Sequence, residues 1–230
     1  MSPIRTRREP SSYRGGDIPN FAVRLRRARL GLGLALAMVT ATFAIFTATF
    51  VFRRLFEEYP GVDSSVTVHV AHWTHLRLPV GLLLLNTFWL LLSSVTMELA
   101  RRQVTQRAAL APVERIPGVS LGNVRLLPWL PATIVLGCAF VAGQAFAWRD
   151  MVARGIYLAT TPNATFVYLA TILHAIHVGA GLLALFIVAG IAVAKASWDT
   201  RRIVVDITAW YWHFMAALWL YLFGLVTVLN

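Results

Sequence analysis

Histidines are the residues whose type and spacing in this sequence could support haem or metal chemistry. His174 and His177 are three residues apart in the run LHAIHVGAG, and His213 lies in AWYWHFMAALW. Two imidazoles from facing helices can bind haem iron axially. Residues three apart share one helix face, so His174 and His177 cannot be the two opposite ligands of one haem. We therefore expect these rings to form interhelical hydrogen bonds or to contact lipid headgroups, with a haem-carrying cytochrome b as an alternative.

A second histidine group, His69, His72 and His75, lies in VHVAHWTHL. A spacing of three would let two neighbours share a metal on one helical turn, but no carboxylate or thiol accompanies them. We expect a polar turn at the membrane surface, anchored by Trp73, and no metal in this chain. We find no nucleophile motif, phosphate loop or set of paired carboxylates either. The residues thus indicate a scaffold with no active site of its own.

The composition shows what kind of element must position these histidines. Of 230 residues, 58% are hydrophobic and 13% are charged, whereas soluble domains are roughly 45 to 50% apolar and about 25% charged. The net charge of +11 would suggest nucleic-acid binding in a soluble chain. Here, however, the arginines flank long apolar runs, so we expect a membrane protein and no nucleic-acid partner. The single cysteine, Cys138, lies inside one of these runs and excludes an intrachain disulfide.

Five apolar stretches are long enough to cross a bilayer. The first has 23 residues without a charge, which at ~1.5 Å per residue gives about 34 Å against a ~30 Å hydrocarbon core. The sequence therefore predicts an all-α integral membrane protein, a bundle of five transmembrane helices at about residues 30–52, 78–97, 127–148, 166–194 and 207–229.

The distribution of Lys and Arg predicts the orientation of this bundle. Sixteen of these residues flank one side of the predicted spans and five flank the other. The positive-inside rule then places the N-terminus in the cytoplasm and the C-terminus outside. We divide the chain into a basic cytoplasmic arm, residues 1–29, and a membrane domain, residues 30–230. The last part of the arm is either a solvated charge run or a segment lying on anionic headgroups.

Polar side chains inside the predicted spans are the candidate functional residues, because such groups usually face protein or water. Besides the histidines they include Asn86, Gln144 and Asp206, which lies near the cytoplasmic end of the last span. Thr171, Ala175 and Gly179 form a stripe of small residues beside His174 and predict close packing against a neighbouring helix.

Four groups of short motifs occur along the sequence. The last predicted helix contains the run AWYWHF at residues 209–214, followed by WLYLF at 219–223. Earlier in the chain are LNT at 85–87 with SSVT at 93–96, GQ at 143–144 before Trp148, and LHAIHV at 173–178. In their residues and order these motifs, which span about residues 30–229, resemble subunit III of haem-copper cytochrome oxidases.

The resemblance implies a five-helix form that lacks two N-terminal helices of longer relatives. It implies a subunit without haem or copper, which are expected in partner subunits, that packs directly on subunit I beside subunit II and small subunits. It also implies bound phospholipid, support for proton uptake in aerobic electron transport, and location in the inner, or plasma, membrane. The candidate structural, lipid or proton-path residues are Asn86, Gln144, His174, His177, Asp206, Trp210, Trp212 and His213, of which Asp206 stands where relatives have Glu.

Three positions depart from the family pattern. Met38, Ala147 and Ala216 stand where relatives carry carboxylates. The absence of these carboxylates argues against the proton-antenna role that the resemblance would imply. It favours a mainly structural and lipid-binding role. It also keeps open a subunit III-like accessory protein of a nitric oxide reductase. A stand-alone channel or transporter is the alternative of another class.

Overall fold

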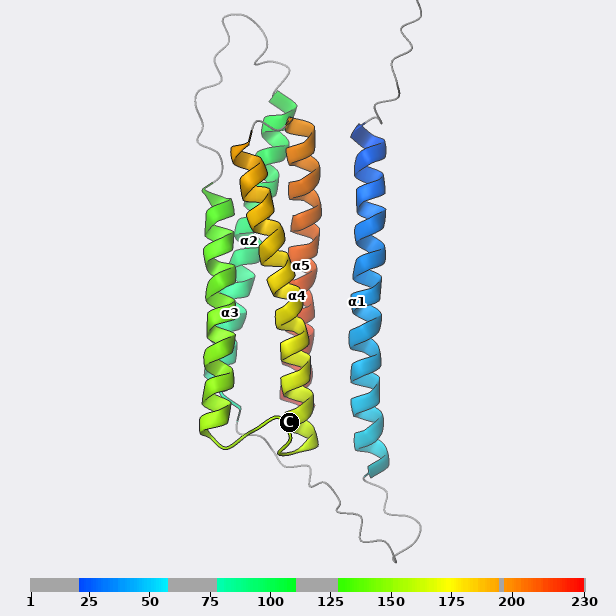
Figure 1. The fold of residues 1–230 in the computed structure, drawn as a ribbon, viewed down its shortest axis with the longest axis vertical. Helices are drawn as coiled ribbons and strands as arrows, with labels where there is room; N and C mark the ends of the chain where they lie inside the picture. The colour runs from blue at the N-terminus through cyan, green and yellow to red at the C-terminus, as the bar shows by residue number, and fades with distance from the viewer. Residues whose placement is uncertain (1–20, 58–77, 111–127, 195–196, 230) are drawn as a thin grey trace, which may run out of the picture.

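Five long helices make up the regular structure of the described part of the chain. The computed structural model describes residues 21–57, 78–110, 128–194 and 197–229, and these contain no strand. Each helix is long and apolar enough to cross a membrane, which confirms the predicted all-α bundle of five spans. Figure 1 shows successive helices running in alternating directions, so that the chain enters the first and leaves the last at opposite ends of the bundle. The helices are α1 (Phe21–Glu57), α2 (Val80–Leu110), α3 (Trp129–Ala153), α4 (Pro162–Val193) and α5 (Trp198–Leu229).

Most of the helices extend beyond the apolar runs that predicted them. α1 begins at Phe21 and not at residue 30, so residues 21–29 are helical and continuous with the first span. α2 continues to Leu110, past the end of its apolar run at Met97. Charged residues end an apolar run without ending a helix, because arginine favours helix and pairs with Glu three or four residues away. Counting apolar residues therefore underestimates helix length at the basic end.

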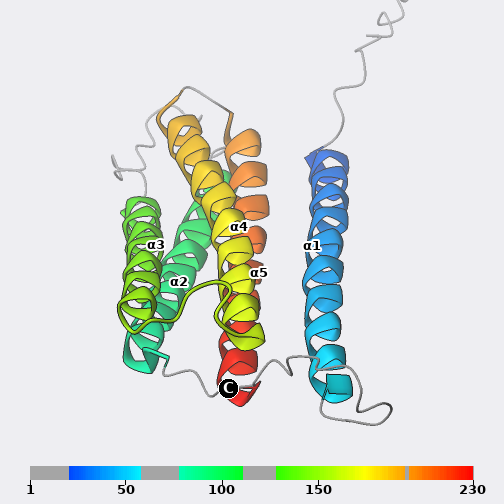
Figure 2. The same cartoon turned by 60° about the horizontal axis from the view of Figure 1, so that its bottom comes forward.

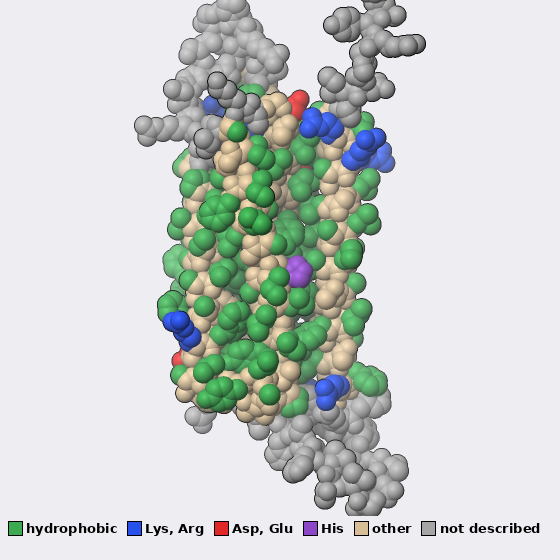
Figure 3. Space-filling view, viewed as in Figure 1, with side chains coloured by type: hydrophobic (Ala, Val, Ile, Leu, Met, Phe, Trp, Pro, Cys, Tyr) green, Lys and Arg blue, Asp and Glu red, His purple; other side chains and the backbone are tan. Residues whose placement is uncertain are grey.

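The bundle is built around α5, and α1 stands at its side. α2 packs against α3 and α5, and α4 packs against α5 and α3. α1 contacts mainly α5, with fewer contacts to α4, and both ribbon views show it apart from the other four helices (Figures 1 and 2). The face of the bundle seen in Figure 3 is dominated by apolar side chains along most of its length, with cations toward the two ends. Such a surface suits a lipid environment.

Trp212 is the central side chain of the bundle. It lies on α5, is fully buried, and its indole Nε1–H donates to Ser93 Oγ of α2 at 2.8 Å. Its ring fills space left by glycines on the two other neighbouring helices. A Cβ at Gly137 of α3 would lie 2.9 Å from the indole, and one at Gly181 of α4 would lie 3.1 Å from it. One indole thus contacts α2, α3 and α4 at once.

The expected small-residue stripe on α4 is only partly buried. Thr171 is buried and accepts a hydrogen bond from Trp148 Nε1 of α3 at 3.1 Å. Gly179 is exposed, however, and has no neighbour within 4 Å of an added Cβ. The close approach occurs at Gly181, where a Cβ would lie 2.9 Å from Tyr211 Cε1 of α5. Close packing at Gly179 was therefore a wrong prediction, since the buried face of α4 passes through Gly181.

This difference gives a matched pair of substitutions. Gly181→Leu should destabilise the detergent-solubilised protein by about 1 to 3 kcal/mol, because the new side chain overlaps Tyr211 and Trp212. Gly179→Leu should leave the melting temperature unchanged or slightly raised, since it adds helix propensity at an open site. Thermal unfolding followed by circular dichroism compares the two. Equal melting temperatures would show that α4 does not approach α5 at Gly181.

Candidate functional site

A network of charged side chains joins three helices at the end of the bundle where α1 and α5 begin. Asp206 of α5 is buried and accepts hydrogen bonds from two arginines on other helices. Arg29 of α1 donates through Nε to Asp206 Oδ2 at 3.0 Å, and its Nη2 lies 2.9 Å from the same oxygen. Arg101 of α2 donates through Nη1 to Asp206 Oδ1 at 3.3 Å. One carboxylate therefore ties α1 and α2 to α5.

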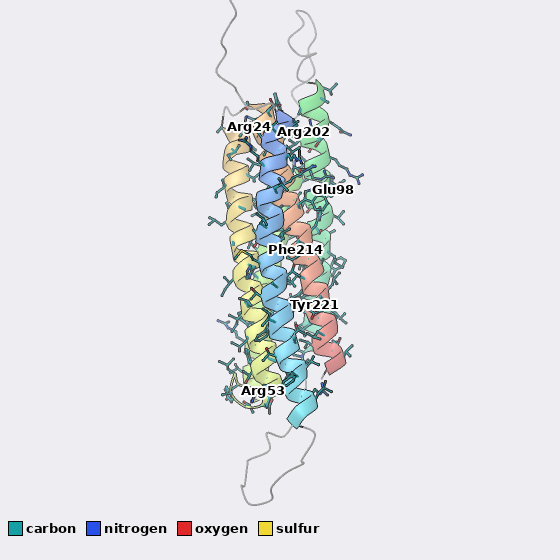
Figure 4. The ribbon with its side chains drawn as sticks, turned by 90° about the vertical axis from the view of Figure 1, so that its right-hand side faces the viewer. Arg24, Arg53, Glu98, Arg202, Phe214 and Tyr221 are labelled. Atoms are coloured by element: carbon teal, nitrogen blue, oxygen red, sulfur yellow. The ribbon has the colours of Figure 1, made fainter. Side chains whose placement is uncertain are left out.

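Glu98 continues this network toward the membrane interior. Arg101 donates to both carboxylate oxygens of Glu98, from Nε at 2.7 Å and from Nη2 at 2.8 Å, and Arg102 donates from Nε at 2.8 Å. His213 Nε2 of α5 lies 3.5 Å from Glu98 Oε2. His213 Nδ1 and Ser94 Oγ of α2 share a hydrogen bond of 2.5 Å. Glu98 lies toward the same end of the bundle as Arg24 and Arg202, opposite Arg53 (Figure 4).

The structure therefore brings two of the predicted residues, Asp206 and His213, into one chain of contacts. Its other members, which were not predicted as site residues, are Arg29, Ser94, Glu98, Arg101 and Arg102. Arg29 lies in the predicted basic arm, Arg101 counted only toward the orientation of the bundle, and Glu98 was not singled out. The spacing of Glu98 to Arg101 and Arg102 is the i+3 and i+4 pattern of helical ion pairs. That spacing was a signal for the pair, although not for the contact with α5.

The histidines of α4 have different surroundings. His174 is buried, and neither ring nitrogen has a hydrogen-bond partner among the described residues. Its ring lies 5.2 Å from that of Trp219 and 6.0 Å from that of Phe140. His177 Nδ1 lies 2.7 Å from the Leu173 carbonyl oxygen of its own helix. Among the described residues, His213 forms the interhelical hydrogen bond of the ring that was expected for these histidines, and His174 and His177 form none.

Two predicted amides are also buried in the bundle. Asn86 of α2 lies against Gly143 of α3, where an added Cβ would lie 2.8 Å from Asn86 Cγ. Gln144 faces the interior from α3. Asn86 Nδ2 and Gln144 Oε1 have no hydrogen-bond partner among the described residues. The glycine explains how α2 and α3 approach closely at Asn86.

Indole N–H groups connect helices through hydroxyl acceptors. Trp219 Nε1 of α5 donates to Thr87 Oγ1 of α2 at 2.9 Å, two helical turns from the Trp212 and Ser93 pair. Repeating the same contact along two antiparallel helices fixes their register. Trp210 differs, because it is 54% exposed on the outside of α5. Of the two predicted tryptophans, only Trp212 belongs to the bundle interior.

The three apolar residues that stand in place of the family's carboxylates differ in exposure. Ala147 and Ala216 are buried in the bundle, whereas Met38 is 73% exposed on α1. A carboxylate at Met38 would face the lipid unless a partner covered it. The histidine group at residues 69, 72 and 75 lies outside the described residues. Within the described ranges, no three metal-ligating side chains of the His, Cys, Asp and Glu types come together.

Comparison with known proteins gives one consistent result. The model of the family described as cytochrome c oxidase subunit III matches residues 25–229. The chain is 29% identical to cytochrome c oxidase subunit 3 of Corynebacterium diphtheriae over 164 residues, 71% of each chain. It is 33% identical to the probable cytochrome c oxidase subunit 3 of Mycobacterium tuberculosis over 101 residues, 43% of this chain and 48% of the relative. A subunit 3 from Struthio camelus is 30% identical over 149 residues, 63% of this chain and 49% of the relative.

The matches cover different shares of the chain, but all of them are to subunit III of cytochrome c oxidase. The chain spans about half the length of the mycobacterial and Struthio relatives that it matches. The family match, in contrast, includes all five helices from near the start of α1 to the end of α5. The chain is therefore a multi-pass membrane protein that belongs to the cytochrome c oxidase subunit III family.

Proposed function

We propose that this chain is the non-catalytic subunit III of a haem-copper terminal oxidase in the plasma membrane. It packs on catalytic subunit I, with subunit II in the same complex, and the haem and copper belong to those partners. The observation that carries the proposal is the family match over residues 25–229. The arginine-rich end of the bundle faces the cytoplasm, and the end of α5 faces the outside.

The contacts of the bundle support a stabilising role. Trp212 and Trp219 connect α5 to α2, and Asp206 connects α5 to α1 and α2. Polar contacts between helices in lipid hold a defined packing that a flat apolar interface would not specify. Such a bundle offers subunit I a fixed surface. Phospholipid bound at the outer face of the bundle belongs to the same proposal.

The position of the charge network supports a contribution to proton uptake. On the proposed topology, Glu98 and Asp206 lie at the cytoplasmic end, where protons enter the complex. Ionisable groups at this depth mark proton paths in many membrane proteins. Ala147 and Ala216 are buried and offer no carboxylate in the bundle interior. This contribution is therefore restricted to the bundle's cytoplasmic end.

Affinity purification through a tag on this chain tests the proposal. We expect recovery of a complex that consumes O2 and contains copper. Recovery of a copper-free reductase that consumes NO would replace the oxidase with a nitric oxide reductase. If the chain purified alone and carried ions or solutes across liposome membranes, it would be a transporter.

His213→Leu separates a stabilising role from a direct role in turnover. Ser94 loses its ring partner and Glu98 loses its imidazole neighbour, which should destabilise the complex by about 0.6 to 1 kcal/mol, as for other polar contacts in membranes. We expect a shorter active lifetime and near-normal initial O2 turnover. His213→Gln, which retains a polar group toward Ser94, is the control. A collapse of initial turnover in an assembled complex with full haem content would contradict the stabilising role.

A further inference from the structure

Three buried polar side chains in the bundle interior have hydrogen-bonding atoms without a partner among the described residues. Asn86 of α2 is 2% exposed, Gln144 of α3 is 3% exposed and His174 of α4 is 1% exposed. The atoms are Asn86 Nδ2, Gln144 Oε1 and both ring nitrogens of His174. Native proteins pair nearly all such buried groups with protein or with ordered water, because an unpaired group has lost its bonds to solvent without replacement.

Asn86 and Gln144 lie beside each other where α2 meets α3. Gly143 directly precedes Gln144, and a Cβ added to this glycine would lie 3.1 Å from Asn86 Nδ2. The Asn86 amide therefore occupies the space next to the α3 backbone at this turn. Asn86 Nδ2 is a donor and Gln144 Oε1 is an acceptor, so their requirements are complementary. The two atoms nevertheless form no direct hydrogen bond.

Gln144 also faces the turn of α4 that carries His174. Phe140 and Trp148 lie four residues before and after Gln144, so the three side chains share one face of α3. Trp148 Nε1 donates to Thr171 Oγ1 of α4 at 3.1 Å, and the Phe140 ring lies 6.0 Å from that of His174. Gln144 therefore lies between two contacts of α3 with α4, opposite the turn from Thr171 to His174.

Trp219 of α5 covers the same cluster from a fourth helix. Its ring lies 5.2 Å from that of His174 and 5.0 Å from that of Phe140. Its Nε1 donates to Thr87, the residue after Asn86. An indole has no other polar atom, so Trp219 excludes bulk solvent from the cluster and offers its unpartnered atoms no hydrogen bond.

Small side chains border the cluster on α3 and α5. Ala147 follows Gln144 by three residues, and Ala216 precedes Trp219 by three residues, so each lies on the same helix face as its neighbour. Both alanines are buried. The cluster thus joins several polar atoms with small apolar neighbours, which is the combination of partners and room that a buried water requires.

We propose that Asn86, Gln144 and His174 form a buried site for ordered water inside the bundle. One water accepts from Asn86 Nδ2 and donates to Gln144 Oε1. The nitrogens of His174 point in diverging directions, and a neutral imidazole has one donor and one acceptor, so a single water cannot bond both. The site therefore takes at least two waters, which connect α4 to α2 and α3. It belongs to the bundle itself and does not depend on which complex the chain joins.

Radiolytic hydroxyl-radical labelling of the purified complex tests the site, because radicals formed from an ordered water label the buried side chains beside it. Trp219 and Trp212 are a matched pair, since both are buried indoles of α5 that donate Nε1 to a hydroxyl of α2. Trp212 is bordered by Gly137 and Gly181, away from the cluster. We expect Trp219 to be labelled severalfold faster than Trp212. Equal labelling of the two tryptophans would overturn the site.

Two substitutions on α4 assign the water to His174. His174→Phe keeps a ring against Trp219 and removes both nitrogens, so the labelling of Trp219 should fall toward that of Trp212. His177→Phe is the control one turn along, where Nδ1 lies 2.7 Å from the Leu173 carbonyl oxygen of its own helix. This variant should label as the unaltered complex does. Equal effects of the two substitutions would overturn the assignment to His174.

Gln144→Leu distinguishes bound water from atoms that stay unpaired. Leucine is similar in size and has no polar atom. If Gln144 Oε1 accepts from water, the substitution leaves that water one partner short and should lower the melting temperature of the detergent-solubilised protein by about 2 to 4 °C. An unchanged or raised melting temperature would overturn the proposal, because removing an unpaired buried group is favourable. Labelling of the unaltered complex tests the site even where a variant fails to assemble.

Discussion

Trp212→Ala should lower the unfolding free energy of the solubilised protein by about 3 to 5 kcal/mol, the range for removing a large aromatic side chain from a packed core. The indole is fully buried and touches α2, α3 and α4 from α5. Its removal leaves a void at the centre and leaves Ser93 Oγ without its donor. Glycines at 137 and 181 cannot fill the void, because they have no side chain to move into it.

Trp210→Ala is the control for this substitution. Trp210 lies two residues away on the same helix and is 54% exposed, so its removal should change the unfolding free energy by less than about 0.5 kcal/mol. Unfolding in a denaturing detergent, followed by circular dichroism, measures both variants without depending on tryptophan fluorescence. Equal effects of the two substitutions would show that Trp212 is not the centre of the bundle.

Asp206→Ala should destabilise the protein by about 2 kcal/mol and release the beginning of α1 from α5. Removing one partner of a buried ion pair leaves the other charges uncompensated, at about 3 to 5 kcal/mol for full burial. The smaller value applies because the Arg29 side chain is 50% exposed and can reach water, whereas Asp206 is 9% exposed. Arg101 keeps Glu98 as its second partner.

Disulfide trapping or spin labels on α1 and α5 would detect this release directly. Asp206→Asn, which keeps the shape and one acceptor oxygen, should show an intermediate loss of stability. The contact of Tyr221 OH with Thr47 Oγ1 at 3.0 Å should persist in both variants, because it lies farther along α1 (Figure 4). An unchanged distance between the first turns of α1 and α5 in Asp206→Ala would contradict the role of the network.

The fold was predictable because the bilayer restricts the solutions so strongly. A run of about 20 apolar residues must cross as a helix, since lipid offers no partner for unpaired backbone groups. Five such runs therefore gave five helices. Their ends were less predictable, because Glu98 and Arg101 continue α2 through ion pairs that an apolar count does not register.

The site was predictable only in part, because spacing along one helix does not state which residue of another helix faces it. Asp206 and His213 were identified as polar groups that need partners, and the structure gives them Arg29, Arg101, Ser94 and Glu98. Those partners lie on α1 and α2, more than 100 positions away in sequence. Gly179 and Gly181 show the same limit, since two residues of offset separate an exposed glycine from one at a helix contact.

The burial of Ala147 and Ala216 shows how these departures from the family pattern affect helix packing. Ala147 and Ala216 lie in the interior, where an unpaired carboxylate would be strongly unfavourable. The small side chains let α3 and α5 pack without such a group. This arrangement agrees with a subunit that mainly stabilises its partners.

The most direct measurement of the central claim is the haem and copper content of the complex that co-purifies with this chain, compared with that of the chain after dissociation. The proposed function predicts both haem and copper in the intact complex, with O2 as the substrate. It predicts neither in the separated chain. Iron or copper that remains bound to the separated chain would contradict a non-catalytic subunit III.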